Sequence, residues 1–174
     1  MIDRGRYNLL GVWVNALDYE AAVERIIAAA HAGQGFAVAA LPAHGIITGL
    51  DPEHRTRLAR FDLICPDGQP VRWALDWLYR TALPDRVYGP TLMLRVCERA
   101  ADEGLPIYLY GSRPAVVENL QRSLPARFPG LQIAGARAPY FRRVSADEQA
   151  EIVRTIRESG ARLTFIGLGC PRQE

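Results

Sequence analysis

Short apolar runs alternate with amphipathic stretches along most of this 174-residue sequence. Apolar runs of this length are typical of buried strands, and apolar residues repeating every three or four positions are typical of helices. Their alternation predicts an α/β domain in which helices flank a mainly parallel sheet. We expect strands at residues 7–14, 36–41, 61–64, 107–110, 131–134 and 163–168, and helices at residues 19–32, 44–60, 70–79, 89–103, 115–127 and 145–158.

The ends of several expected helices carry residues with a known capping role. Asp18 precedes the first helix, where its carboxylate can accept a backbone hydrogen bond, and Gly33 and Gly35 end that helix. Gly89–Pro90 favours a helix start, because proline suits the first turn. Ser145 with Glu148 three residues later has the spacing of a capping box. The fold class is therefore α/β and Rossmann-like, with a small N-terminal β element in which the first strand forms part of a hairpin.

Composition indicates an ordinary globular chain, with 49% apolar and 23% charged residues. The pattern contains neither a linker nor an internal repeat, so we expect a single domain over residues 1–174. All 21 basic residues are arginine, the net charge is +2, and the two signs are interspersed, so a nucleic-acid surface is not indicated. No apolar run approaches the roughly 18 residues that cross a bilayer, and we expect a chain that is at most peripheral to the membrane.

The three cysteines, Cys65, Cys97 and Cys170, are odd in number and widely spaced. They form no CxxC pair and have no histidine at metal-ligand spacing, so the sequence predicts neither a disulfide framework nor a metal site. A reducing, cytoplasmic setting follows from this pattern. No GxGxxG or GxxxxGK[ST] motif occurs, which argues against dinucleotide and Walker-type nucleotide binding, and so against a Rossmann-type oxidoreductase.

Chemistry in such a fold is expected in the loops that follow the strands, because ligands of open α/β sheets bind beyond the carboxyl ends. Four loops qualify: 42–44, 66–68, 111–114 and 167–174. Gly111, Ser112, Gly167 and Gly169 allow the close backbone approach that a phosphate needs. A glycine at a strand end is nevertheless a plain turn residue more often than a binding residue.

Asp67, in the loop Cys65-Pro66-Asp67-Gly68, is the best candidate for acid–base chemistry. A carboxylate that follows a buried strand points into the crevice shared by these loops, where limited solvation tunes its pKa. The alternative is a turn aspartate that bonds the backbone of its own loop, and the local sequence leaves the two interpretations nearly balanced.

Three further polar residues have equally divided interpretations. His44 lies near the same crevice by topology, although a capping or packed histidine is the commoner case. Arg86 can clamp a diphosphate with its planar fork, or it can form a surface ion pair with Asp85. Gln173 is either a substrate contact or a frayed terminal residue.

The sequence resembles the WecG/TagA/CpsF glycosyltransferases, family twenty-six of that classification. The resemblance runs from Arg6 to the last residue. Any one of its motifs is weak, but all occur in the same order and at family-like spacing. They are Asp62–Gly68, Asp85–Pro90, Leu109–Pro114, Arg127–Leu131 and Ile166–Glu174.

The resemblance implies transfer of a sugar from a UDP-sugar to a polyprenyl-diphosphate-linked saccharide, with inversion and without a metal or other cofactor. It makes Asp67 the general base and places Arg86 and Gln173 in contact with substrate. The nucleotide-sugar side of the pocket would then be formed by the loops containing Gly111 and Gly167. The substrate-binding residues expected on this basis are Arg86, His44, Gly111, Ser112, Tyr140, Gly167, Gly169 and Gln173. Such an enzyme works at the inner face of the cell membrane.

The sequence departs from the family pattern at a few places. Ala39 and Leu41 stand where a Thr-x-Asn pair is common, and Thr91 stands at a position that is often acidic. The chain also ends in a strand-to-helix loop, before the basic C-terminal segment of the family. We therefore expect a truncated chain, and two hypotheses follow: a glycosyltransferase, or a UDP-sugar-binding remnant that no longer turns over. Apolar side chains left uncovered would favour a homo-oligomer.

Overall fold

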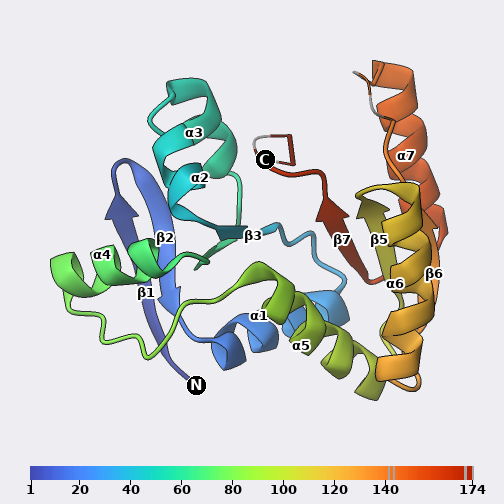
Figure 1. Ribbon diagram of the computed structural model, residues 1–174, viewed down its shortest axis with the longest axis horizontal. Coiled ribbons are helices and arrows are strands. Elements are labelled where there is room, and N and C mark those ends of the chain that lie inside the picture. The colour runs from blue at the N-terminus through green and yellow to red at the C-terminus, as the bar shows by residue number, and fades with distance from the viewer. Residues whose placement is uncertain (141, 143, 171, 174) are drawn as a thin grey trace. The chain divides into compact units, whose positions relative to one another are not determined.

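The computed structural model describes residues 1–140, 142, 144–170 and 172–173. They form two compact units, which are described separately. Unit 1 comprises Met1–Val96 with Cys170 and Arg172, and unit 2 comprises Cys97–Gly169 with Gln173. Parallel strands flanked by helices occur in both units, and an antiparallel hairpin begins the chain (Figure 1), so the expected α/β fold class is confirmed.

The N-terminal hairpin consists of β1 (Asp3–Leu9) and β2 (Val12–Leu17), which pair antiparallel. Leu10 and Gly11 both have positive φ, 55° and 92°, as a tight two-residue hairpin turn requires. The expected strand over 7–14 therefore runs through the turn and is wrong in its bounds. Because Leu10 is apolar like its neighbours, the apolar run shows no break at the turn, and Gly11 is the one residue that indicates it.

The parallel strands of unit 1 are β3 (Val38–Leu41) and β4 (Leu63–Pro66). Asn15 of β2 is fully buried, and its side-chain oxygen accepts a hydrogen bond from the Ile64 amide at 3.0 Å, which ties the hairpin to β4. The core of this unit joins the hairpin, both strands and the helices that cover them, through Leu9, Val12, Val14, Ala16, Leu41, Ile46, Leu58, Ile64, Val71, Leu75 and Leu83.

Helix α1 (Tyr19–Ala32) begins and ends as predicted. The Asp18 carboxylate accepts hydrogen bonds from the amides of Ala21 at 2.9 Å and Ile2 at 2.8 Å, so the cap also fixes the helix to the start of the chain. Gly33 closes the helix in the left-handed conformation.

The helix expected over 44–60 is wrong, because the structure has two shorter helices there. They are α2 (Ala43–Thr48) and α3 (Pro52–Leu58). Asp51 accepts a hydrogen bond from His54 N at 2.9 Å and caps α3, while Pro52 takes the first helical position. Proline disfavours a helical residue before it, so the chain ends one helix and starts another.

Helices α4 (Gln69–Tyr79) and α5 (Gly89–Asp102) lie within two residues of their expected bounds. Val71 and Leu75 of α4 are buried in the core, whereas Leu78 is 60% exposed. Tyr79 fixes the end of α4 to the hairpin, since its hydroxyl donates to the Asn8 carbonyl at 2.6 Å.

Unit 2 contains a three-stranded parallel sheet in the order β6-β5-β7, formed by β6 (Ile133–Arg137), β5 (Ile107–Gly111) and β7 (Leu163–Gly167). Helix α6 (Pro114–Arg127) packs on β5 and β6 (Figure 1). Helix α7 (Ala146–Glu158) starts with the predicted capping box of Ser145 and Glu148. The strand expected over 131–134 begins two residues later than predicted.

Candidate functional site

In unit 1 the loops after β3 and β4 meet at one edge of the strand pair. The strands are in parallel register with Leu41 opposite Pro66, and the Asp67 amide donates to the Leu41 carbonyl at 3.3 Å. A Cβ atom at Gly68 would lie 3.5 Å from the backbone nitrogen of Ala43, so the start of α2 lies against the Asp67 loop. This is the arrangement expected of parallel strand ends.

The Asp67 carboxylate is half-buried and is bound by a distant part of the chain. Its Oδ2 atom accepts a hydrogen bond from the Gly89 amide at 3.3 Å, 22 residues further along the sequence. The hydrogen bond does not come from its own loop, as the turn interpretation would have it. The convergence of two remote segments on one carboxylate is what a site requires and a simple turn does not.

Burial raises the pKa of Asp67 above its ordinary value of 3.8. The hydrogen bond from Gly89 and the positive charge of Arg86 act in the opposite direction and offset part of this rise. A carboxylate with a raised pKa holds a proton more strongly than a free aspartate does. It is therefore a better acceptor for a proton from a substrate hydroxyl.

Residues 85–89 form a segment, here called the Asp85–Gly89 strap, that crosses the end of β4. The Val87 amide donates to the Pro66 carbonyl at 2.8 Å, and Val87 is fully buried. The strap ends at Gly89, where a Cβ atom would lie 3.2 Å from the Ala40 side chain and 3.4 Å from the Asp67 carboxylate. Glycine at this position lets the backbone amide approach the carboxylate without a crowded Cβ.

Arg86 is half-buried in the strap, with its guanidinium 4.7 Å from the centre of the Tyr88 ring. The ion pair considered for Arg86 and Asp85 is replaced by other contacts. The Asp85 carboxylate accepts hydrogen bonds from the Gln69 side chain at 2.9 Å and from the Arg86 amide at 2.7 Å. The Arg86 charge instead acts on Asp67, whose pKa it lowers.

His44 lies in α2, one residue after Ala43, and its side chain is exposed. The helix cap is Pro42, so His44 neither caps the helix nor packs in the core. The two positions that depart from the family pattern, Ala39 and Leu41, are buried in β3. Two polar candidates therefore lie on segments next to the Asp67 loop: Arg86 on the strap, and His44 at the start of α2.

In unit 2 the glycines after β5 and β7 lie against each other. Gly111 has φ +131°, and a Cβ atom there would lie 2.6 Å from the backbone of Gly167. The Ser112 amide donates to the Gly167 carbonyl at 2.8 Å, and Ser112 itself has a positive φ of 63°. The sequence indicated a close approach between these glycines and a phosphate. The close approach in the structure is instead between the ends of β5 and β7.

The remaining expected site residues of unit 2 have partners within that unit. The Gly169 amide donates to the side-chain oxygen of Gln173 at 3.0 Å, which closes the loop between them. The Tyr140 hydroxyl accepts a hydrogen bond from Arg137 at 2.9 Å, and Arg137 and Arg142 lie against its ring. Contact of these side chains with substrate remains a prediction.

No sequence pattern indicated the groups that hold the strap in place. They are the Gly89 amide, the Tyr19 hydroxyl, which accepts from the Tyr88 amide at 2.8 Å, and the Gln69 side chain. The Gly-Pro pair at residue 89 indicated a helix start, which is correct, but gave no sign that its amide binds a carboxylate. Contacts between segments this far apart in sequence leave no local pattern.

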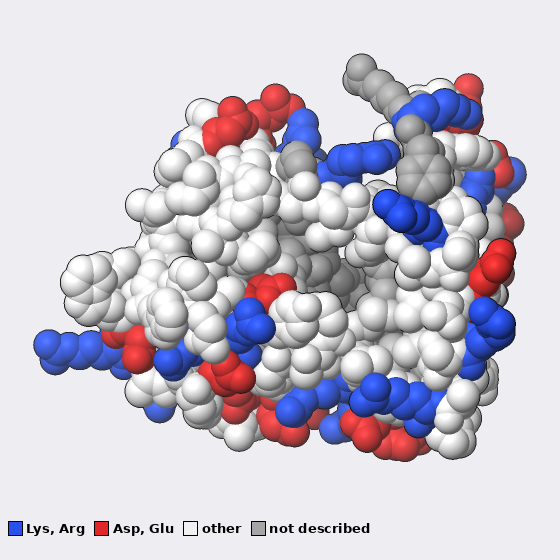
Figure 2. Space-filling view, in the orientation of Figure 1, with Lys and Arg blue, Asp and Glu red and all other residues white. Residues whose placement is uncertain are grey.

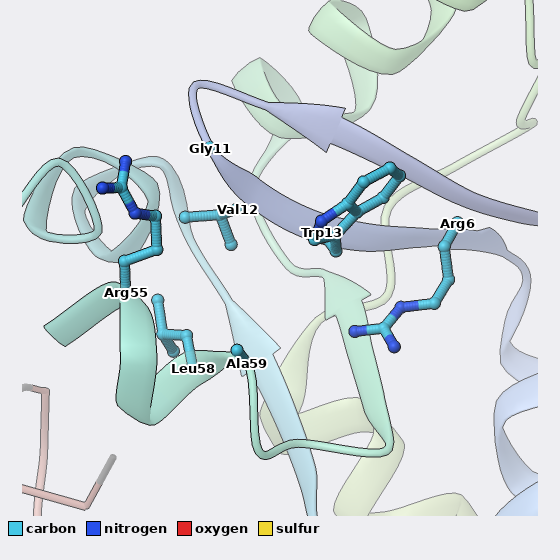
Figure 3. Close-up of a pocket in the computed structure, with 7 residues that line it drawn as sticks. All are labelled: Arg6, Gly11, Val12, Trp13, Arg55, Leu58 and Ala59. Carbon is cyan, nitrogen blue, oxygen red and sulfur yellow. The ribbon is translucent and has the colours of Figure 1, made fainter. Parts of the chain in front are cut away.

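One small pocket lies elsewhere in unit 1, between the hairpin and α3 (Figure 3). Its volume of about 10 Å³ has room for about one water molecule. It is lined by Arg6, Gly11, Val12, Trp13, Arg55, Leu58 and Ala59, none of which is an expected site residue. Over the described part of the chain, no three His, Cys, Asp or Glu side chains are close enough to hold a metal ion, and no helix is long and apolar enough to cross a membrane.

Comparison with known families matches a sequence model described as the Glycosyl transferase WecG/TagA/CpsF family over residues 7–174. The match covers nearly all of the chain, including the Asp67 loop, the strap and the strand-end glycines of unit 2. The protein therefore belongs to the WecG/TagA/CpsF family of glycosyltransferases, as its motifs indicated.

Proposed function

We propose that this WecG/TagA/CpsF glycosyltransferase transfers an N-acetylhexosamine, hexose or uronic acid from a UDP-sugar to a polyprenyl-diphosphate-linked acceptor. The product would enter cell-surface or exopolysaccharide synthesis. The observation that carries the proposal is the Asp67 carboxylate, which is half-buried, has a raised pKa and is bound by the Gly89 amide beside Arg86. A site of this kind can take a proton from a sugar hydroxyl near neutral pH.

The proposed reaction is a single displacement with inversion and needs no metal. Asp67 accepts the proton of the acceptor hydroxyl while that oxygen attacks the anomeric carbon. The bond from this carbon to the UDP oxygen breaks, and its electron pair leaves with UDP. Arg86 can stabilise the charge that develops on the departing diphosphate, as can backbone amides. Asp67 then returns its proton to solvent.

Unit 2 is proposed to hold the nucleotide-sugar. Its candidate contacts are Gly111, Ser112, Gly167, Gly169, Tyr140 and Gln173. His44 is a separate candidate substrate contact within unit 1. Support comes from the exposed backbone of Gly167. A Cβ atom added to Gly167 would have no atom within 4 Å, so the space on that side of the backbone is open. Open backbone of this kind lets a phosphate or ribose approach closely.

UDP release tests the proposal directly. The protein is incubated with each of several UDP-sugars, with and without a polyprenyl-diphosphate-linked monosaccharide, and released UDP is measured. We expect release that depends on the acceptor. Asp67→Asn should lower kcat by roughly 10²- to 10⁴-fold, the usual contribution of a general base. Asp62→Asn is the matched control, because this exposed carboxylate bonds the Ala37 amide at the other end of β4.

Two results would contradict the proposal. One is the absence of acceptor-dependent UDP release with every donor, and the other is unchanged turnover in Asp67→Asn. Calorimetry with UDP then decides between the two sequence-based hypotheses: binding without transfer supports a UDP-sugar-binding protein, and no binding at millimolar UDP excludes it.

A lipid-linked acceptor places the proposed reaction at the cytoplasmic face of the membrane, and α4 has a suitable surface. Trp73, Trp77 and Leu78 are 58%, 87% and 60% exposed on the helix that starts directly after Gly68. Figure 2 shows uncharged side chains over this helix, at the left of the view. Tryptophan concentrates at the boundary between lipid and water, so we propose that this face contacts the bilayer.

Co-flotation with vesicles of phosphatidylglycerol and phosphatidylcholine tests this contact. A Trp73→Ser, Trp77→Ser double variant should float several-fold less than the parent protein. Trp13→Ser is the control, because the third tryptophan of the chain is 50% exposed on the hairpin. Equal flotation of parent and double variant would overturn the bilayer assignment. A smaller oligomer for the double variant by light scattering would indicate self-association instead.

A further inference from the structure

The Asp85–Gly89 strap is held by its successive backbone amides. Each of the amides from Arg86 to Gly89 donates to a different acceptor. The first two bond the Asp85 side chain at 2.7 Å and the Pro66 carbonyl at 2.8 Å. The next two bond the Tyr19 hydroxyl at 2.8 Å and the Asp67 carboxylate at 3.3 Å. All four amides from Arg86 to Gly89 are therefore engaged, three of them with groups outside the strap.

The contact with Asp67 is the longest of these hydrogen bonds and depends on the others. A separation of 3.3 Å is slightly longer than the usual range for an N–H···O bond, about 2.7–3.2 Å. A shift of the strap by a few tenths of an ångström would break it, and the adjacent hydrogen bond is the one made by Tyr19. The pKa of Asp67 depends on the Gly89 amide, whose hydrogen bond lowers it.

Tyr19 is well placed to hold the strap because it is itself fixed. It is the first residue of α1, directly after the Asp18 cap that binds both α1 and the start of the chain. The guanidinium of Arg95 lies 4.5 Å from the centre of its ring, and Arg95 also pairs with Glu20. The phenolic oxygen is thus presented at a defined position, where it can accept the Tyr88 hydrogen bond.

We propose that Tyr19 is a positioning residue for Asp67. By accepting the hydrogen bond of the Tyr88 amide, its hydroxyl keeps the next amide, that of Gly89, on the Asp67 carboxylate. The same contact fixes the Tyr88 backbone, and so the ring against which Arg86 lies. This inference rests on the proposed function of Asp67 as the base. Tyr19 acts on the carboxylate indirectly, because the amide it binds, that of Tyr88, is adjacent in the chain to the Gly89 amide that binds Asp67.

Tyr19→Phe removes the hydroxyl and keeps the ring under Arg95. The Tyr88 amide then loses its partner, the strap loosens, and the Gly89 hydrogen bond to Asp67 weakens. Because that bond lowers the pKa of Asp67, the pKa should rise, and the acid side of the kcat/KM profile should move to higher pH. We expect roughly three- to tenfold lower kcat/KM on the acid side, with a much smaller change on the alkaline plateau.

Tyr79→Phe is the matched control. Its hydroxyl also bonds a backbone group of unit 1, the Asn8 carbonyl, but it does not touch the strap. It should lower thermal stability comparably and leave the pH profile in place. Equal displacement of the profile by both variants, or none by Tyr19→Phe, would overturn the positioning role.

A second readout keeps this test separate from the proposed function. The carboxyl carbon of Asp67, assigned by its loss in Asp67→Asn, is titrated by NMR in the parent and in each tyrosine variant. A higher pKa in Tyr19→Phe alone supports the positioning role even if no acceptor-dependent transfer is found. An unchanged titration in an active enzyme refutes the role of Tyr19 and leaves Asp67 as the base.

Discussion

Parallel strands end in loops in both units, but the loops are stabilised in different ways. In unit 1, the loop after β4 carries the Asp67 carboxylate, which accepts a hydrogen bond from the strap. The strap begins at Asp85, 19 residues after the end of β4 at Pro66. In unit 2, β5 and β7 each end in a glycine, and the two strand ends are joined by a hydrogen bond from the Ser112 amide to the Gly167 carbonyl. One edge presents a charged side chain, and the other presents backbone.

The strand-end loops of the two units also differ in what each holds in an unfavourable state. Unit 1 keeps Asp67 half-buried, although burial opposes its ionisation, and offsets this with a hydrogen bond and the Arg86 charge. The strand-end loops of unit 2 carry unusual backbone instead: Gly111 has φ +131°, which glycine adopts readily, and the non-glycine Ser112 has φ +63°. A change at the Asp67 loop should therefore appear mainly in pH dependence, and a change at Gly111 should appear mainly in stability.

The largest expected effect is on the acid side of the activity profile. Proton transfer to Asp67 requires its ionised form, so activity falls about tenfold for each pH unit below its pKa. Burial raises this pKa, so the fall begins at higher pH than for an ordinary aspartate. Arg86→Gln removes a charge that lowers the pKa, and it should move the acid side of the kcat/KM profile further towards neutral pH.

Movement of the profile in the opposite direction would contradict this account of Asp67. Arg113→Gln provides the comparison in unit 2, because Arg113 is exposed and stands at the start of α6. It should leave the acid side of the profile in place whatever it does to KM.

The next effect is on the stability of unit 2. In Gly111→Ala the new Cβ would meet the Gly167 backbone at 2.6 Å, and alanine disfavours the φ of +131°. We expect a loss of about 3 kcal/mol or more in the free energy of unfolding, measured by urea denaturation. Gly104→Ala, at φ +66° with no atom within 4 Å, isolates the cost of the backbone conformation and should lose only about 1–2 kcal/mol. Equal losses would show that the strand contact is not tight.

The sequence predicted the fold class and most helices because these depend on local patterns. Helix caps act within a few residues of their own position, and the predicted caps are confirmed: Asp18 and Gly33 of α1, and the Ser145–Glu148 capping box of α7. The errors lie where the apolar pattern continues through a break. Leu10 continues the run of the hairpin strands. The apolar residues after His44 run to Leu50, where Asp51 and Pro52 already marked the start of α3.

The candidate site was predictable only in part. Topology placed Asp67 and the α2 start at one strand edge, because parallel strands end on the same side. The hydrogen bonds that determine the behaviour of Asp67 come from backbone amides of the strap, and any residue type except proline has such an amide. Tyr19 is 69 residues from Tyr88, and no periodicity links the two.

A smaller effect concerns the stability of unit 1. Because the pKa of Asp67 is raised in the folded protein, the folded state binds more protons than the unfolded state as pH rises through the window above 3.8. Stability is lost across that window, and the loss persists at neutral pH. Asp67→Asn cannot ionise, so it should melt at slightly higher temperature than the parent at pH 7.5, with the difference shrinking towards about pH 4. A lower Tm at pH 7.5 would show that the carboxylate stabilises the fold.

The smallest effect expected is the labelling rate of two buried cysteines, one in each unit. Burial raises the pKa of Cys65 in β4 and of Cys97 in α5 to about 12, whereas Cys170 is partly exposed. A thiol reagent at pH 8 should modify Cys170 first and reach the other two only when their units open. Mass spectrometry of the labelled peptides gives each rate. Gly111→Ala should accelerate labelling of Cys97 and leave Cys65 unchanged, because its strain is in unit 2. If both rates rise together, the two units unfold as one, and the effect of Gly111→Ala is not confined to unit 2.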